Sequence, residues 1–387
     1  MRLTTYLLVS AFLVPVGCSD EEEHDEGGGE ETADTGEVCE PEVVELEPLV
    51  AECSPLATDY RPTLSSMSAW PACITDDGEY HLFGNSPGTI ARIEAYEDMR
   101  DALLTGSRPR PDDFTRARVA YSQEEGLESR LVRREDLHFP EIPMSDWEAG
   151  VDPDKQCTVA TNVTKYPDRC IGPARMAPVI NKAFEDGQLG VGNAHVHAER
   201  IDATIIWFLH LSTYKEAFTC TFKGQDCDSA WAYYTGGTNR QGGLGMAAQV
   251  RALDPAAHDA IWDGILAARC WRDAYSSDEY PTFEDVPQEG QELFLRGWKQ
   301  LDDALWHGYA LIVRDRLERQ LNVCGDLAEA NHAWLDVAGP VLAWEARNRD
   351  SAQAAALEAA WSGGQPSREQ VEAAVDALDA LFPCPEP

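Results

Sequence analysis

The chain has 387 residues, of which 68 are Asp or Glu and 31 are Lys or Arg, and its formal net charge at pH 7 is -37. Surfaces that bind nucleic acid or anionic lipid heads need clustered Lys and Arg, so this balance excludes both kinds of partner. Cationic ligands, metal ions included, would instead be attracted to the chain.

The first residues, MRLTTYLLVSAFLVPVGC, are typical of a secretory signal. Arg2 precedes an apolar run that is too short to span a membrane, and the small residue Gly17 stands before Cys18. A cysteine directly after the cleavage position resembles the signal of bacterial lipoproteins. We therefore expect residues 1–17 to be removed and Cys18 to carry lipid. Ordinary signal-peptidase cleavage at the same position is the alternative.

An acidic stretch follows Cys18. Residues 19–50 contain fourteen Asp or Glu and no Lys or Arg. Repulsion between like charges and the lack of apolar surface favour an extended, disordered segment. We predict that residues 18–50 tether the rest of the chain to the bacterial cell envelope through the lipid. Calcium binding is the alternative for this tail, but no loop brings its carboxylates together on one ion.

Ten cysteines remain besides Cys18, an even number in a chain expected to reach an oxidising compartment. This count predicts up to five disulfides. Spacing does not fix their pairing, although Cys157 with Cys170 and Cys220 with Cys227 are close enough for local pairs. No C-x-x-C occurs in the sequence, so neither a thioredoxin-type redox site nor a zinc ribbon is supported.

The first predicted elements after the tether form a helical hairpin. Apolar residues recur three and four apart between Pro87 and Gly106, which indicates an amphipathic helix. A second helix starts after several prolines, with Asp112 as its expected cap. Residues 127–170 are rich in Pro, Asp and paired charges and predict a long irregular connection.

Helical patterns fill most of the remaining chain. Ser367, followed three residues later by Gln370, is typical of a capping box at the start of the last helix. Tryptophans occur nearly once per helix and are best explained as core residues, since a haem or carbohydrate platform needs rings exposed together. The predicted ranges are roughly 193–219, 228–235, 243–252, 255–274, 288–320, 326–347, 350–361 and 367–381.

These patterns predict an all-α fold. We expect a disulfide-linked helical bundle with long irregular connections over residues 51–387, as one domain or as two packed halves, 51–150 and 151–387. Strand signals are few, because alternating Val, Ile and Thr runs are scarce.

Two stretches resemble the imelysin-like proteins. They are CDSAWAYYTGG, Cys227 to Gly237, and HAWLDVAGPVLAWEARNRDSAQAAALEAAWSGG, His332 to Gly364. The resemblance covers about the C-terminal half of the chain. It implies an exported, largely helical protein, often a lipoprotein, built as a pair of bundles and linked to iron or haem acquisition. The family's motif, Gly-x-His-x-x-Glu, has its nearest counterpart in the residues from Gly192 to Glu199, at other spacings.

The candidate chemistry lies in GNAHVHAERIDATIIWFLHLSTY, Gly192 to Tyr214. On a helix, His195, Glu199 and Asp202 share one polar stripe, and nearly all the rest of the circumference is apolar. Such a helix is usually central, so its carboxylates and imidazole would be enclosed and would need partners or a metal. The three residues span about 10 Å along the axis, whereas His210 lies roughly 12 Å further along.

We predict that His195 and Glu199 are metal ligands, with Asp202 as a third ligand or as the acceptor for the imidazole N–H. The metal would be iron, free or in haem, or another transition metal. Three functions stay open: a binding protein, which we favour; a metal-dependent enzyme or acid–base catalyst; and a structural or interaction module in which the stripe pairs with arginines or faces water. No catalytic residue is predicted.

Two further motifs have ordinary structural explanations. Glu329, His332 and Asp336 include one Glu-x-x-His pair, but di-iron bundles need two, and these residues lie opposite the apolar face of their helix. The glycine-rich loop from Thr235 to Met246, with Arg240, could present N–H groups to an anion. No P-loop Lys-Ser/Thr follows it, so a helix connector is the simpler interpretation.

Overall fold

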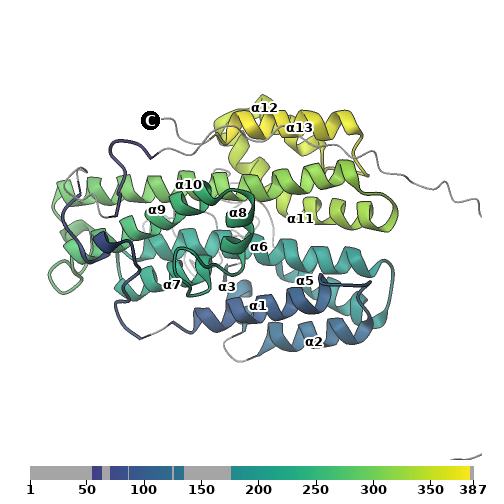
Figure 1. Cartoon of the computed structure of the whole chain (residues 1–387), viewed down its shortest axis with the longest axis horizontal. Helices are drawn as coiled ribbons and strands as arrows, with labels where there is room; N and C mark the ends of the chain where they lie inside the picture. The colour runs from purple at the N-terminus through teal and green to yellow at the C-terminus, as the bar shows by residue number, and fades with distance from the viewer. Residues whose placement is uncertain (1–54, 63–69, 86, 124–125, 135–175, 384–387) are drawn as a thin grey trace, which may run out of the picture. The chain divides into compact units, whose positions relative to one another are not determined.

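The computed structural model describes residues 55–62, 70–85, 87–123, 126–134 and 176–383 (Figure 1). All of these residues belong to one compact unit. We call residues 55–62 and 70–85 the N-terminal segment. The predicted signal, Cys18, the tether and a boundary at residue 150 lie outside the described residues.

Within the described ranges the secondary structure is all α, with twelve α-helices, two short 3-10 helices and no strand, which confirms the predicted fold class. None of these helices combines the length and the apolar character needed to cross a membrane. Their bounds in chain order are η1 (Ile74–Asp77), α1 (Thr89–Leu103), α2 (Pro111–Ser122), α3 (Leu127–Arg134), α5 (Met176–Leu189), α6 (Ala194–Thr219), α7 (Gly224–Thr235), α8 (Met246–Leu253), α9 (Pro255–Ala274), η4 (Phe283–Asp285), α10 (Gln288–Asn322), α11 (Gly325–Arg349), α12 (Ser351–Ala359) and α13 (Arg368–Leu381).

Helix α6 is the central helix of the bundle. It packs against α5, α7, α10 and α11, and in Figure 1 it lies between the α1–α2 hairpin and the pair α10 and α11. Four consecutive residues, Ile205, Ile206, Trp207 and Phe208, are fully buried. Consecutive helical residues point to different sides, so α6 is enclosed all round, as its apolar circumference predicted.

Helices α9 and α10 approach each other closely at Gly264. A Cβ atom at this position would lie only 2.7 Å from the Cα of Leu301, so no larger residue fits without moving a backbone. This contact fixes the two helices that carry most of the cavity described below.

The predicted core tryptophans are confirmed. Trp298 is half-buried and stacks on Phe294 with the ring centroids 6.4 Å apart. The other eight in the predicted helices are buried: Trp207, Trp231, Trp262, Trp271, Trp306, Trp334, Trp344 and Trp361. Burying large rings supplies apolar area at low conformational cost, which suits the inner faces of a bundle.

Two helices were not predicted as such. Helix α3 lies within residues 127–170, which we predicted as an irregular connection, and α5 lies between predicted elements. Helix α5 buries Met176, Ile180 and Phe184 at a spacing of four, which is a helical face. Nearby prolines and glycines concealed this pattern, because such residues usually end helices.

Of the two predicted helix caps, the capping box at Ser367 is confirmed and the cap at Asp112 is wrong. Ser367 Oγ accepts a hydrogen bond from Gln370 N at 3.3 Å, and Ser367 N donates to the Gln370 side chain at 2.8 Å, as a capping box requires. Asp112 does not cap α2. Arg110 is the N-cap residue instead, and its backbone N–H donates to the Asp113 side chain at 2.8 Å. A proline occupies the first helical position, to which it is suited because no N–H is needed there.

Two disulfides join described residues. The predicted local pair Cys220–Cys227 is confirmed, with Cα atoms 4.8 Å apart. A second pair, Cys73–Cys270, has Cα atoms 5.5 Å apart and joins the N-terminal segment to α9 across 197 residues of sequence. The proposed pair Cys157–Cys170 lies outside the described residues.

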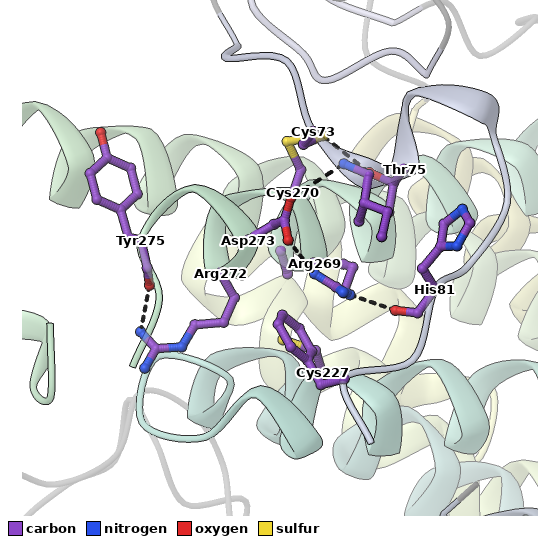
Figure 2. A network of polar contacts seen from close by, with 12 residues as sticks. Cys73, Thr75, His81, Cys227, Arg269, Cys270, Arg272, Asp273 and Tyr275 are labelled. Carbon is purple, nitrogen blue, oxygen red and sulfur yellow. Dashed lines mark hydrogen bonds and ion pairs between the residues drawn. A yellow bond between two sulfur atoms is a disulfide. The ribbon is translucent and has the colours of Figure 1, made fainter. Parts of the chain in front are cut away.

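The N-terminal segment is bound to α9 by more than the disulfide. Figure 2 shows Arg269 beside Cys270, with its Nε donating to the carbonyl oxygen of His81 at 2.6 Å. The guanidinium also lies 3.4 Å from the centre of the Phe83 ring, a cation–π contact. A disulfide, a hydrogen bond and a cation–π contact therefore hold the N-terminal segment on α9, although the residues that they join are more than 180 positions apart in sequence.

The carboxyl of the half-buried Asp302 gives the bundle a pH-dependent stability. Burial raises the pKa of Asp302 to about 7 from an ordinary 3.8, with Glu345 as the next contributor, so the folded state retains a proton that the unfolded state loses. Stability therefore falls as pH rises from about 4 to 7. We expect Asp302→Asn to raise the free energy of unfolding, and the gain to be about 1–2 kcal/mol larger at pH 8 than at pH 5.

Urea unfolding at the two pH values measures this difference. Asp376→Asn is the control, because Asp376 is exposed on α13 and its replacement should have nearly the same effect at both. A gain for Asp302→Asn that did not change with pH would contradict the expectation.

Candidate functional site

The predicted stripe on α6 brings two of its three members together around an arginine. Arg316 of α10 lies 2.8 Å from Glu199 and 3.1 Å from Asp202, measured between nitrogen and oxygen atoms. Arg319 pairs with the second oxygen of Glu199 at 3.3 Å. Both carboxylates are buried, so ion pairing offsets the cost of removing their charge from water.

Asp202 is the most heavily bonded residue of this network. It accepts hydrogen bonds from the Tyr96 hydroxyl at 2.6 Å and from Trp334 Nε1 at 2.8 Å, and Arg100 Nε lies 3.5 Å away. Burial and the Asp202 charge raise the pKa of Tyr96 well above its ordinary value, so the phenol stays protonated and donates. Side chains from four helices meet at this one carboxylate.

The arginines compensate the negative charge of the stripe. Burial alone would lower the pKa of Arg316, but Glu199 and Asp202 raise it overall, so the guanidinium stays charged. The two carboxylates face three guanidinium groups, of which Arg100 also lies 3.7 Å from Glu97, so arginine charge compensates both acids of the stripe. A cavity beside Asp202 measures about 10 Å³, which is about the room that one water molecule needs.

His195, the third predicted ligand, does not join the network. It is half-buried, and its backbone N–H donates to the side chain of Asn193, the N-cap of α6, at 3.1 Å. No described hydrogen bond or ion pair links its ring to Glu199 or Asp202. The structure therefore brings together the two acids of the predicted trio and leaves the imidazole apart.

The other two histidines of this stretch have structural positions. His197 is buried, with its Nε2 2.7 Å from the carbonyl oxygen of Val191, to which it donates. His210 lies against Trp306 and Tyr309, and burial lowers its pKa to about 3, so it stays neutral.

Three more histidines that could have completed a metal site lie elsewhere. In each case a ring nitrogen contacts a backbone carbonyl: His258 with Arg240, His307 with Phe382 and His332 with Gly363. Among the described residues no group of three or more His, Cys, Asp or Glu could hold a metal ion. Metal binding by His195, Glu199 and Asp202 stays a prediction, which metal analysis of the purified protein can test.

The two further motifs behave as expected. Glu329 and Asp336 are exposed on α11, and His332 is half-buried. In the glycine-rich loop, Gly245 N donates to Glu97 at 2.6 Å, and Arg240 pairs with acids of α9. The loop connects two helices, with its polar groups engaged by the protein itself.

A cavity of about 420 Å³ lies between the N-terminal segment, α9 and α10. Small-molecule pockets in proteins have volumes of about 300–1,000 Å³, so this cavity is large enough to hold a ligand. Its lining combines apolar groups, such as Leu56, Ala260 and Ala304, with charged groups at residues 59, 259, 263, 296, 299 and 303. It therefore has the mixed lining that binds and orients small molecules.

Three of the four aspartates in the lining have a cationic partner. Asp259 and Asp263 share Arg240, and Lys299 donates to Asp303 at 2.7 Å. Burial raises the pKa of Asp263 to about 6, and Arg240 opposes this shift.

Asp59 is the exception. It is only 7% exposed, and the one described hydrogen bond to its carboxylate comes from the backbone N–H of Leu56 at 2.8 Å. Within the described part of the chain it makes no ion pair, since the neighbouring Arg61 donates instead to the carbonyls of Pro55 and Leu56. Burial raises the pKa of Asp59, and the hydrogen bond from Leu56 and the nearby charges of Arg61 and Lys299 oppose this shift only in part.

The cavity wall formed by the N-terminal segment is held in place by specific contacts. Gln300 of α10 exchanges two hydrogen bonds with the backbone of Tyr60, at 2.8 and 3.1 Å. Trp70 Nε1 donates to the carbonyl of Thr58 at 3.2 Å. The Tyr60 hydroxyl lies 2.7 Å from Thr75 Oγ1, two residues beyond the disulfide cysteine Cys73.

Sequence reasoning missed this site because its parts are about 200 residues apart. The nearest signal is local: Asp259 with Asp263, and Lys299 with Asp303, are four apart and so lie on one face of each helix. Charged faces of helices usually contact water, and nothing local indicates that these two faces flank a cavity.

No family model matches the chain, and neither the curated proteins nor the solved structures include a match.

Proposed function

We propose that this protein is an exported, lipid-anchored binding protein of the bacterial cell envelope. Its helical domain would hold a small molecule in the cavity between the N-terminal segment, α9 and α10. The observation that supports binding is the cavity itself: about 420 Å³, lined by apolar and charged side chains on two helices packed closely at Gly264.

Export and anchoring rest on the sequence. The apolar signal, the position of Cys18 and the acidic tether support a lipoprotein, and the resemblance to imelysin-like proteins agrees with this. The Cys73–Cys270 and Cys220–Cys227 pairs also suit an oxidising compartment, in which disulfides persist.

Small-molecule binding is a better-supported function of the domain than metal binding. The acids of the α6 stripe are paired with arginines, whereas Asp59 in the cavity is buried and has no ion pair with any described residue. A metal-dependent enzyme would need an open coordination position, and an interaction module would need no cavity.

Filling the cavity tests the proposal. Ala260 lies in the cavity wall on α9, so Ala260→Trp should place an indole ring in the space and remove ligand binding. The measurement is ligand-observed NMR with a fragment library that contains neutral, cationic and anionic members in equal shares. Fragments that bind the wild type should fail to bind the variant.

Ala373→Trp is the matched control, because Ala373 is exposed on α13 and outside the cavity. It should bind the same fragments as the wild type. Circular dichroism confirms that both variants fold. If no fragment binds the wild type, or if Ala260→Trp binds them unchanged, the proposed site is wrong.

A further inference from the structure

We propose that the cavity selects a protonated organic amine with an apolar body, held by Asp59 as its counter-ion. This inference rests on the proposed function, since it assigns the chemical class of ligand to the same cavity. It is carried by the position of Asp59: a buried carboxylate in a ligand-sized space, without an ion-pair partner in the described part of the chain.

The charges of the lining favour a cation. Four aspartates line the cavity. Three cations face them: Arg296 and Lys299 in the lining, and Arg240, which pairs with Asp259 and Asp263. The balance is one net negative charge. Buried charges are normally paired, so a carboxylate in this position is best satisfied by a ligand that carries a positive charge. An ammonium group also donates the charge-assisted hydrogen bonds that a carboxylate accepts.

Arg296 is the opposing consideration. It lines the same cavity and makes no ion pair within the described residues, so it could attract an anion. Asp59 is the more deeply buried of the two, whereas Arg296 is only half-buried and keeps contact with water. A desolvated charge gains more from a partner than a hydrated one does, so Asp59 should dominate selectivity.

The apolar part of the lining determines the chemical character of the ligand outside its amine group. Leu56 and Pro55 lie on the wall formed by the N-terminal segment, and Ala257, Ala260 and Ala304 lie on the helices. Small alanine side chains leave room for a flat or branched hydrocarbon group. An amine attached directly to a ring or a short alkyl chain therefore fits both parts of the cavity.

Three compounds of nearly the same size test the charge preference: phenethylamine, phenethyl alcohol and phenylacetate. We expect the amine to bind the full mature protein about tenfold more tightly than the alcohol, and phenylacetate most weakly, in titration calorimetry at pH 7. Asp59→Asn should remove the preference for the amine while still accepting the hydrogen bond from Leu56 N. Asp376→Asn, which removes the same charge far from the cavity, should keep it.

Asp263→Asn gives a second measurement that does not depend on the folding of the first variant. Asp259 remains as a partner for Arg240, so the fold should persist and amine binding should weaken about threefold with no change for the alcohol. Equal or tighter binding of the alcohol or phenylacetate, or an unchanged preference in Asp59→Asn, would overturn the amine assignment. If none of the three compounds binds although library fragments do, the assignment of an amine ligand is wrong and the proposal that the cavity binds a small molecule stands. If no library fragment binds the wild type, both proposals are wrong.

Discussion

Asp202→Ala is expected to cost about 3–5 kcal/mol of unfolding free energy, the range typical of breaking a buried ion-pair network. The variant leaves Arg316 buried beside Glu199 alone and removes the acceptor of both the Tyr96 hydroxyl and Trp334 Nε1. Desolvated donors without an acceptor retain the full cost of their lost hydration. Urea unfolding at pH 7 measures the loss.

The matched control is Asp376→Ala, an exposed aspartate on α13 that should change stability by less than about 0.5 kcal/mol. The loss of unfolding free energy for Asp202→Asn should lie between those of Asp202→Ala and Asp376→Ala, because an amide oxygen still accepts one hydrogen bond but carries no charge. A cost below about 1 kcal/mol for Asp202→Ala would contradict the structural role of the network. A stability that depended on added iron or another metal would instead favour the metal site predicted from the sequence.

Removal of the Cys73–Cys270 disulfide is the second large expected effect. The double variant Cys73→Ser/Cys270→Ser should lose about 4–5 kcal/mol, because the bond closes a chain segment of 197 residues and so restricts the unfolded state strongly. Thermal and urea unfolding of the variant, compared with the oxidised wild type, measure this loss.

The same variant should also weaken ligand binding. The disulfide holds the N-terminal segment on α9, and through Tyr60 and Thr75 it is connected to the wall that carries Asp59. Cys220→Ser/Cys227→Ser is the control. Its short loop predicts a smaller loss of about 2 kcal/mol, and its cysteines do not line the cavity. Equal losses from the two double variants, or unchanged binding of phenethylamine in the first, would contradict this account.

The helices could be predicted closely because their signals are local. The pattern over 255–274 coincides with α9, and Ser367 with Gln370 marks the start of α13, because both depend on residues three and four apart. The central position of α6 also followed from its own residues, since a helix that is apolar on nearly every side has to be enclosed. Helix α5 was missed where prolines and glycines weakened the same kind of signal.

The candidate site could not be predicted in the same way. The sequence placed Glu199 and Asp202 on one buried stripe, which is confirmed, and left open whether arginines or a metal would satisfy them. The structure brings Arg316, 114 residues from Asp202, onto both carboxylates. No local pattern distinguishes an acid that will meet an arginine from one that will meet a metal ion.

The sequence by itself determined most of the helices and the enclosed polar stripe of α6, and it offered Cys220–Cys227 as a local pair, because each depends on interactions within a few residues. Only the tertiary structure decided the partners of that stripe, the bond from Cys73 to Cys270 and the cavity around Asp59. These depend on which helix faces pack together. Packing is set by the shapes of many side chains at once, so distant residues meet in a way that no short pattern records.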